Sequence, residues 1–154
     1  MLTPPEIVDV PAVPAAVIEI VVARTEMPRV MRPAIAELLG VLQAQGLRPS
    51  GPRFAHHLEI THEAFHFELG FPVEGTVTPA GRVRPGMLPA ARIGRAVYTG
   101  PYPGLHAAWE AFDDALTADG WTLAPQVWEE YLTGPEGGGD PSTFRTRFNR
   151  PVSR

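Results

Sequence analysis

Residues 35–47, IAELLGVLQAQGL, and residues 109–121, WEAFDDALTADGW, share one pattern. Each stretch begins on a large apolar residue, places further apolar residues three and seven positions later, and ends on a glycine followed by an apolar residue. The spacing predicts an amphipathic helix, and the glycine predicts its left-handed C-terminal cap. A chain that contains this helix twice predicts a duplicated supersecondary unit, because a solenoid would need more copies.

The similarity extends on both sides of the helix. The shift that aligns the two stretches also aligns Gly51–Phe54 with Pro125–Trp128, and after a five-residue insertion it aligns Pro72-Val73 with Pro151-Val152. Two copies of one unit usually pack about a pseudo-twofold axis, and the groove on that axis is a natural place for a ligand. We therefore expect a Pro-rich, extended or mobile lead-in at 1–15, and one domain at 16–154 with repeats 16–73 and 92–152 and a connector 74–91.

Each unit is expected to contain a strand, a helix and two further strands. Pro28 is expected to open the first helix and Gly46 to end it, while Gly120 ends the second helix, which carries Leu105, Phe112 and Leu116 on one face. The fold class predicted is α+β, an antiparallel sheet with helices on one face and a central ligand groove. The expected strands are 18–23, 54–61, 64–71, 92–99, 125–133 and 143–150, with a flexible loop at 134–142.

The composition excludes several classes of protein. The chain has 154 residues, a net charge of −4, and no cysteine, so it has no disulfide, no thiolate metal site and no Cys nucleophile. A general nucleic-acid binder would carry a basic face, and neither a signal peptide nor a membrane-spanning apolar run is present. No phosphate-binding glycine motif and no Gly-x-Ser-x-Gly occurs. These features predict a cytoplasmic protein without a cofactor, a nucleic-acid partner or a membrane partner.

The segment Trp128–Leu132 is the best candidate for chemistry. Side chains alternate along a strand, so Glu129 and Tyr131 share one face. We expect that face to meet the groove and Trp128 to pack under the helix layer. A carboxylate beside a phenol can hold a cationic or polar ligand, or act as a general base on water. The alternative is that Glu129 and Glu130 are solvated.

The first repeat differs from the second at this place. Ala55 and His57 occupy the positions of Glu129 and Tyr131, so only the second repeat carries the carboxylate. We expect His57 to form a wall of the groove. Four histidines lie close together in sequence, but without the spacing of a known metal motif, so no metal site is predicted. Trp109, on the second helix stripe, is expected to be a core residue.

The second repeat resembles a known family. Its succession of Tyr98–Tyr102, a Trp-bearing helix, Gly120, Trp128–Leu132 and a last strand ending in Pro151-Val152 is similar to the GyrI-like small-molecule-binding domain, which also forms the effector-binding domain of multidrug-responsive transcription activators. The resemblance covers about 92–152 and, more weakly, 16–73. It implies a groove for bulky hydrophobic and often cationic compounds, with a buried Glu of a Glu-x-Tyr pattern as key ligand residue, here Glu129 with Tyr131.

The resemblance leaves three functions open. The first is a stand-alone binding protein for drug-like or toxin-like compounds, and the second a hydrolase that opens cyclopropane-bearing toxins with Glu129. The third is a protein-interaction module such as a gyrase modulator, although no protein partner is indicated. Two departures matter: Glu130 replaces a usually apolar residue and is expected to be exposed, and the last strand carries Arg147 and Arg150. If Arg147 reaches the groove, it pairs with Glu129 and weakens cation binding.

Overall fold

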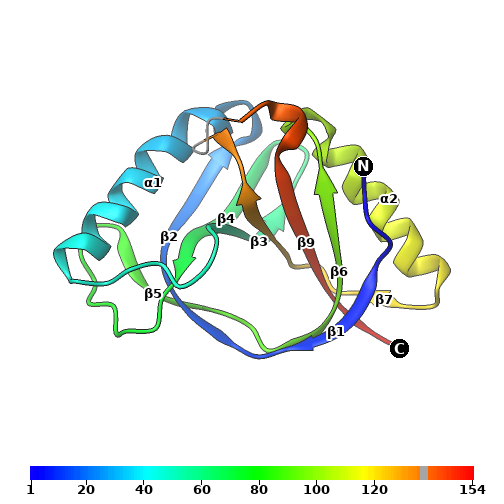
Figure 1. The fold of residues 1–154 in the computed structure, drawn as a ribbon, viewed down its shortest axis with the longest axis horizontal. Helices are drawn as coiled ribbons and strands as arrows, with labels where there is room; N and C mark the ends of the chain where they lie inside the picture. The colour runs from blue at the N-terminus through cyan, green and yellow to red at the C-terminus, as the bar shows by residue number, and fades with distance from the viewer. Residues whose placement is uncertain (136–138) are drawn as a thin grey trace. The chain divides into compact units, whose positions relative to one another are not determined.

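Two successive strand–helix–strand–strand runs make up the protein, as the repeated sequence predicts (Figure 1). The computed structural model describes residues 1–135 and 139–154, so most of the triglycine in the expected loop lies outside the described residues. By its internal contacts the chain divides into two compact units: Pro11–Ala90, the first unit, and Met1–Val10 with Ala91–Arg154, the second unit. Each unit is described by itself.

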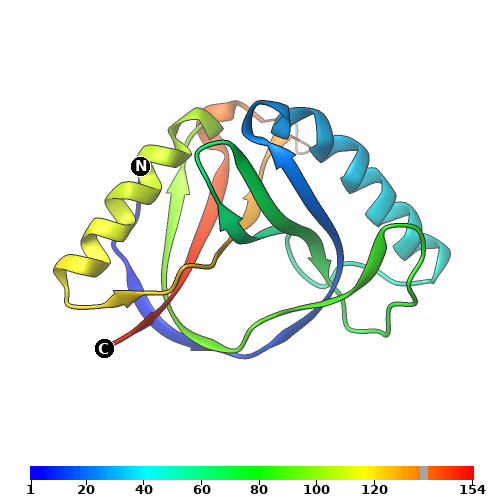
Figure 2. The same cartoon turned by 180° about the vertical axis from the view of Figure 1, so that it is seen from behind.

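The first unit has one helix and four antiparallel strands in the order β3-β4-β2-β5. A tight turn at 61–63 joins β3 and β4 in a hairpin (Figure 2). In this turn the Thr61 hydroxyl accepts hydrogen bonds from the amides of Glu63 and Ala64. Helix α1 buries one stripe, Ala34, Leu38 and Leu42. The elements are β2 (Val13–Ala23), α1 (Met27–Ala44), β3 (Phe54–Ile60), β4 (Ala64–Pro72) and β5 (Val83–Leu88).

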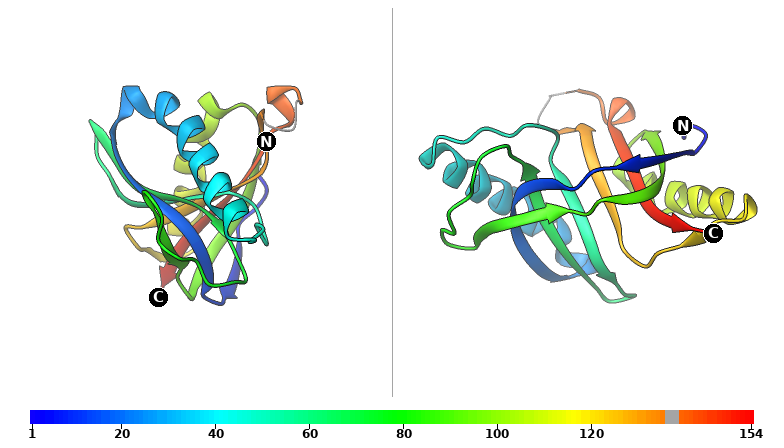
Figure 3. Two further views of the ribbon diagram at one scale, coloured as in Figure 1. Left: turned by 90° about the vertical axis from the view of Figure 1, so that its left-hand side faces the viewer. Right: turned by 90° about the horizontal axis from the view of Figure 1, so that it is seen from below.

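The second unit repeats this arrangement, with strands in the order β1-β6-β9-β8. Its first strand, β1, comes from the beginning of the chain and pairs antiparallel with β6 (Figure 3). The predicted lead-in thus contains a strand, which the Pro-rich composition did not reveal. The elements are β1 (Glu6–Val10), β6 (Ala91–Thr99), α2 (Leu105–Ala118), β7 (Thr122–Leu123), which pairs with β9, β8 (Val127–Thr133) and β9 (Arg145–Ser153).

Both helices end in the same way, which explains the shared sequence pattern. Gly46 and Gly120 take φ values of 69° and 88°, and each follows the last helical turn. The amide of the next residue, Leu47 or Trp121, donates back to the carbonyl of Leu42 or Leu116. These are Schellman caps, which satisfy carbonyls that the helix leaves without a partner.

Pro33 lies inside α1. It is the seventh residue of α1, one turn beyond Pro28 at the helix start. A proline there removes the hydrogen bond to the carbonyl of Arg29. Because the 3-10 turn Arg24–Glu26 leads directly into α1, the helical path starts earlier than Pro28 suggested.

The core of the second unit lies between α2 and one face of its strands. Phe112 and Leu116 of α2 pack with Ala96 of β6 and Phe148 of β9. Helix and sheet approach closely at Gly94, where an added Cβ would lie 2.7 Å from Leu116. The α+β class and the antiparallel pairing are therefore confirmed, whereas the groove between the repeats stays a prediction. None of the helices in the described residues is long and apolar enough to span a membrane.

Candidate functional site

Glu129 and Tyr131 do share a face of β8, and that face is the one covered by α2. Glu129 stands opposite Phe148 of β9, whose ring stacks on Trp109 of α2 with the ring centroids 4.3 Å apart. The expectation that Trp128 packs under the helix layer is therefore wrong. Alternation identifies the two faces of a strand, but the need to bury a Trp does not say which face the helix covers. Trp128 is 2% exposed on the other face.

The Glu129 carboxylate receives one hydrogen bond on each oxygen. The indole Nε1–H of Trp109 donates to Oε1 over 2.8 Å, and the hydroxyl of Tyr131 donates to Oε2 over 3.1 Å. The residue is only 8% exposed. One donor comes from the helix and the other from the strand of Glu129 itself, so the packing of α2 on β8 orients the carboxylate.

Burial and hydrogen bonding act on this carboxylate in opposite directions. Burial raises the pKa of Glu129 above its ordinary value, and the two donors oppose that rise because they favour the charged form. No cationic side chain pairs with Glu129 within the described part of the chain. A buried carboxylate in this state can take up a proton, a cationic ligand or a hydrogen-bond donor.

Further aromatic rings pack against the two donors of the carboxylate. Trp109 stacks on Phe148 and meets Phe112 edge to face, while the ring of Tyr102 lies 6.1 Å from that of Tyr131 and 5.3 Å from that of Phe144. Faces of such rings attract cations, and their area encloses apolar groups.

Trp109 joins the candidate site through its contact with Glu129, whereas its sequence position predicted a core residue only. Its side chain is only partly buried, and it both stacks on Phe148 and donates the hydrogen bond to Glu129. A signal did exist: an indole N–H on an apolar helix stripe needs an acceptor, and a carboxylate on a facing strand can provide one.

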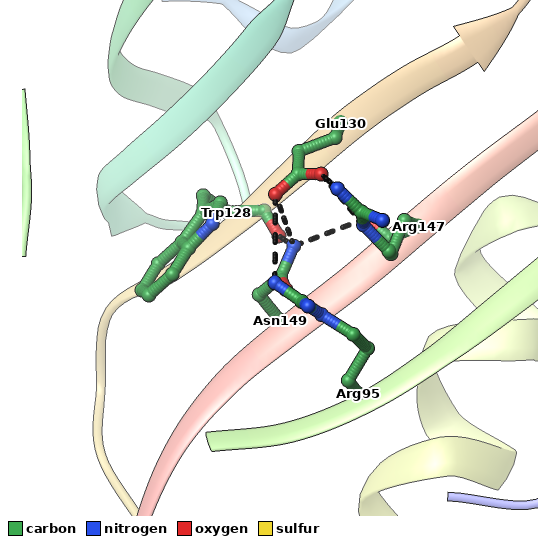
Figure 4. Close-up of polar contacts among 5 residues, drawn as sticks. All are labelled: Arg95, Trp128, Glu130, Arg147 and Asn149. Carbon is green, nitrogen blue, oxygen red and sulfur yellow. Dashed lines mark hydrogen bonds and ion pairs between the residues drawn. The ribbon is translucent and has the colours of Figure 1, made fainter. Parts of the chain in front are cut away.

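Arg147 lies on the opposite face of the sheet and does not pair with Glu129. Its Nε donates to Oε2 of Glu130 over 2.6 Å, and its Nη2 also binds this oxygen (Figure 4). Glu130 is 7% exposed, so the expectation of an exposed charge is wrong. The register sets Glu130 directly opposite Arg147, and this cross-strand pair buries the carboxylate while the Arg147 side chain stays 30% exposed. The guanidinium of Arg147 therefore pairs with Glu130 and does not neutralise Glu129.

Arg150 lies on the face of the sheet that α2 covers, but it pairs with a carboxylate other than Glu129. Its guanidinium binds both carboxylate oxygens of Asp113 on α2 and the carbonyl of Ala124. It sits 5.8 Å from the ring centroid of Trp109. Arg150 thus ties α2 to β9 beside the site, and its charge is compensated by Asp113.

Ala55 and His57 lie in the first unit, both buried on one face of β3. The His57 ring packs against Phe65 and Phe67, with centroids 5.6 and 5.4 Å away. Burial lowers the pKa of His57 to about 4, so its imidazole is neutral near pH 7, and its Nδ1 has no hydrogen-bond partner among the described residues. In those same residues no group of three His, Asp or Glu side chains could hold a metal ion.

A cavity of about 280 Å³ opens elsewhere in the second unit, between β1 and the C-terminal half of α2. It is lined by Pro5, Ile7, Ala115, Leu116, Ala118 and Asp119. None of the predicted site residues contributes to it.

Solved structures show the same fold at low sequence identity. The C-terminal domain of EcmrR has 18% identity and a TM-score of 0.84 over 97% of both chains. The chain covers 58% of EcmrR as seen in its complex with DNA. SAV2435 bound to tetraphenylphosphonium has 9% identity and a TM-score of 0.70, with 97% of this chain and 93% of that chain covered.

A hydrolase from Listeria innocua has 12% identity and a TM-score of 0.66, with 97% of this chain and 91% of that chain covered. No curated protein matches the chain. The family model described as the GyrI-like small molecule binding domain matches residues 3–148, nearly the whole length. The chain therefore belongs to the GyrI-like small-molecule-binding domain family.

Proposed function

We propose that this protein binds hydrophobic cations, with Glu129 as the anionic anchor and the aromatic rings near it as the apolar enclosure. The observation that carries the proposal is the state of Glu129: a nearly buried carboxylate that receives hydrogen bonds from Trp109 and Tyr131 and is paired with no cationic side chain among the described residues. Such a charge is costly to keep, and a cationic ligand would compensate it.

The surroundings of Glu129 favour a bulky, delocalised cation over a small ammonium ion. The nearby groups are rings, so they supply area and cation–π contact but few further hydrogen bonds. Ala55 and His57 are proposed as ligand contacts within the first unit. Both are uncharged near pH 7, so they would add no repulsion against a cation. Arg147 is not retained as a ligand contact because Glu130 holds it on the other face.

Tetraphenylphosphonium, the ligand bound to SAV2435, is a suitable probe. Calorimetric titration should show saturable binding to the parent protein. Glu129→Gln should weaken it about tenfold or more, because a charge-assisted contact is lost while the side-chain shape is kept. The melting temperature should hold or rise, since a buried charge has been removed.

The matched control is Glu110→Gln, the same charge change on the exposed side of α2. It should leave the affinity unchanged. Triphenylmethanol, a neutral triaryl compound, should bind parent and Glu129→Gln with similar affinity. If Glu129→Gln bound tetraphenylphosphonium as tightly as the parent, or if both variants weakened it equally, the carboxylate would not be the anchor.

A second candidate function is hydrolysis of strained cyclopropane-bearing compounds. The hydroxyl of Tyr131 and the carboxylate of Glu129 are already hydrogen-bonded, and burial raises the pKa of Glu129 towards that of an effective general base. Water would bond to a ring carbon as the strained C–C bond breaks, and Glu129 would take one proton from the water and pass it to the other carbon, so that the product gains one water.

Incubation with a reactive cyclopropanoid compound distinguishes the two functions. An enzyme yields a product heavier by one water, and Glu129→Gln lowers its rate by about 10²–10⁴-fold, more than it lowers affinity. A binding protein returns the compound unchanged.

A further inference from the structure

The face of the second unit opposite α2 carries a group of arginines that the proposed function does not use. Arg95 of β6 stands opposite Asn149 of β9, and Arg145 and Arg147 alternate with buried residues along β9. All three side chains therefore share one face. Arg95 and Arg147 are half-buried, with 26% and 30% of their side chains exposed, and Arg145 is exposed.

One buried carboxylate serves two of these guanidinium groups. Glu130 accepts from Arg147 through Oε2, while its Oε1 lies 3.8 Å from Nη2 of Arg95 and 3.4 Å from the amide of Asn149 (Figure 4). Asn149 also accepts a hydrogen bond from Nε of Arg95 over 2.9 Å. This network holds both guanidinium groups in place.

The positive charge on this face exceeds the negative charge. Burial lowers the pKa of Arg95, and repulsion from the charge of Arg147 lowers it further. The Nη1 groups of both arginines, and the guanidinium of Arg145, have no hydrogen-bond partner in the described residues. Glu6 of β1, opposite Arg95 in the register, is a second and exposed carboxylate near the group.

The first unit has the reverse charge balance on its equivalent face. The cross-strand pair that corresponds to Glu130 and Arg147 is His56 opposite Glu68. The guanidinium of Arg84 there is shared by two carboxylates, Glu19 and Glu68. The excess of guanidinium groups therefore belongs to the second unit alone and does not follow from the duplicated fold.

We propose that Arg95, Arg145 and Arg147 form a binding site for an oxyanion, a phosphate or carboxylate group, on the face of the second unit opposite α2. An oxyanion between the guanidinium groups would relieve their repulsion and accept from their outward N–H groups, in the geometry that arginine offers to carboxylates and phosphates. The Glu130–Asn149 network orients the arginines in advance, which lowers the entropy cost of binding.

NMR titration of the arginine Nε–Hε signals tests this site directly. Inorganic phosphate and acetate are added in separate arms at constant ionic strength, with chloride as the balancing salt. We expect saturable shifts of the Arg95 and Arg147 signals with at least one of the two anions. The anion that binds with the higher affinity identifies the class of oxyanion that the site prefers. Arg145→Gln should weaken that binding by about tenfold, and Glu6→Gln should strengthen it.

The control is Arg92→Gln, the same charge change on β6 but on its other face, where Arg92 pairs with Asp9. It should leave the affinity unchanged. Shifts that do not saturate in either arm, or an equal loss from Arg145→Gln and Arg92→Gln, would overturn the proposal. The side chain of Arg145 has no hydrogen-bond partner among the described residues, and its backbone bonds stay in the variant, so Arg145→Gln should fold.

Discussion

Trp109→Phe separates the two roles of Trp109 in the proposed site. Phenylalanine keeps an aromatic ring against Phe148 but has no N–H, so Oε1 of Glu129 loses its donor at 2.8 Å. A hydrogen bond to a charged group contributes about 1.5–3 kcal/mol, and the loss falls mainly on the charged form of Glu129. The pKa of Glu129 should therefore rise further.

The same change predicts how stability depends on pH. A carboxyl whose pKa is raised in the folded state stabilises the fold below its unfolded pKa, and this contribution is lost as pH rises through the folded pKa. Trp109→Phe should therefore cost more stability at pH 8 than at pH 4, by up to about 3 kcal/mol. Urea unfolding at both pH values measures this difference.

The pKa itself can be followed by NMR of the Glu129 side-chain carboxyl carbon. Glu129→Gln is the second arm of a double-mutant cycle, and in its background Trp109→Phe should lose its pH dependence. An unchanged pKa in Trp109→Phe, or a stability loss equal at both pH values, would mean that the indole does not stabilise the charged carboxylate.

Three further changes have defined expected outcomes. The pKa of His57 is lowered from an ordinary 6.5 to about 4 in the folded protein, so the free energy of unfolding should fall by about 3 kcal/mol as pH drops from 6.5 to 4. His57→Phe should remove this pH dependence in acid titrations followed by circular dichroism. Glu130→Gln should cost about 2–3 kcal/mol in urea unfolding because it leaves Arg147 without its carboxylate, whereas a solvated Glu130 would predict no loss. Gly120→Ala should lower the free energy of unfolding by about 1 kcal/mol, because its φ of 88° is strained for alanine while the added Cβ would meet nothing within 4 Å. A loss well above this value in urea unfolding would contradict the reasoning.

Periodicity predicted the parts of the fold that depend on local chemistry. The stripes of α1 and α2, the caps at Gly46 and Gly120 and the pairing of β3 with β4 all follow from spacing and turn residues close in sequence. The strand β1 could not be predicted in this way, because Glu6–Val10 is short, is flanked by prolines and pairs with residues far along the chain. Local patterns carry no information about such distant pairing.

The candidate site was predicted only in part for a related reason. Glu129 and Tyr131 share a face because neighbouring residues of a strand alternate, and this needs no tertiary information. Which face the helix covers, and that Trp109 reaches Glu129, depend on how α2 packs on β8. The burial of Glu130 depends likewise on its register with Arg147 across β9.

The pairing of β1 with β6 affects the order in which the chain can fold during synthesis. The first unit, Pro11–Ala90, is continuous in sequence, so it can form as soon as its last strand has left the ribosome. The second unit cannot, because Glu6–Val10 leave first and must wait for Ala91–Arg95 before their ladder can close. Until then β1 is an unpaired edge on a growing chain, and its short length and its acidic residues Glu6 and Asp9 keep such an edge from pairing with other chains.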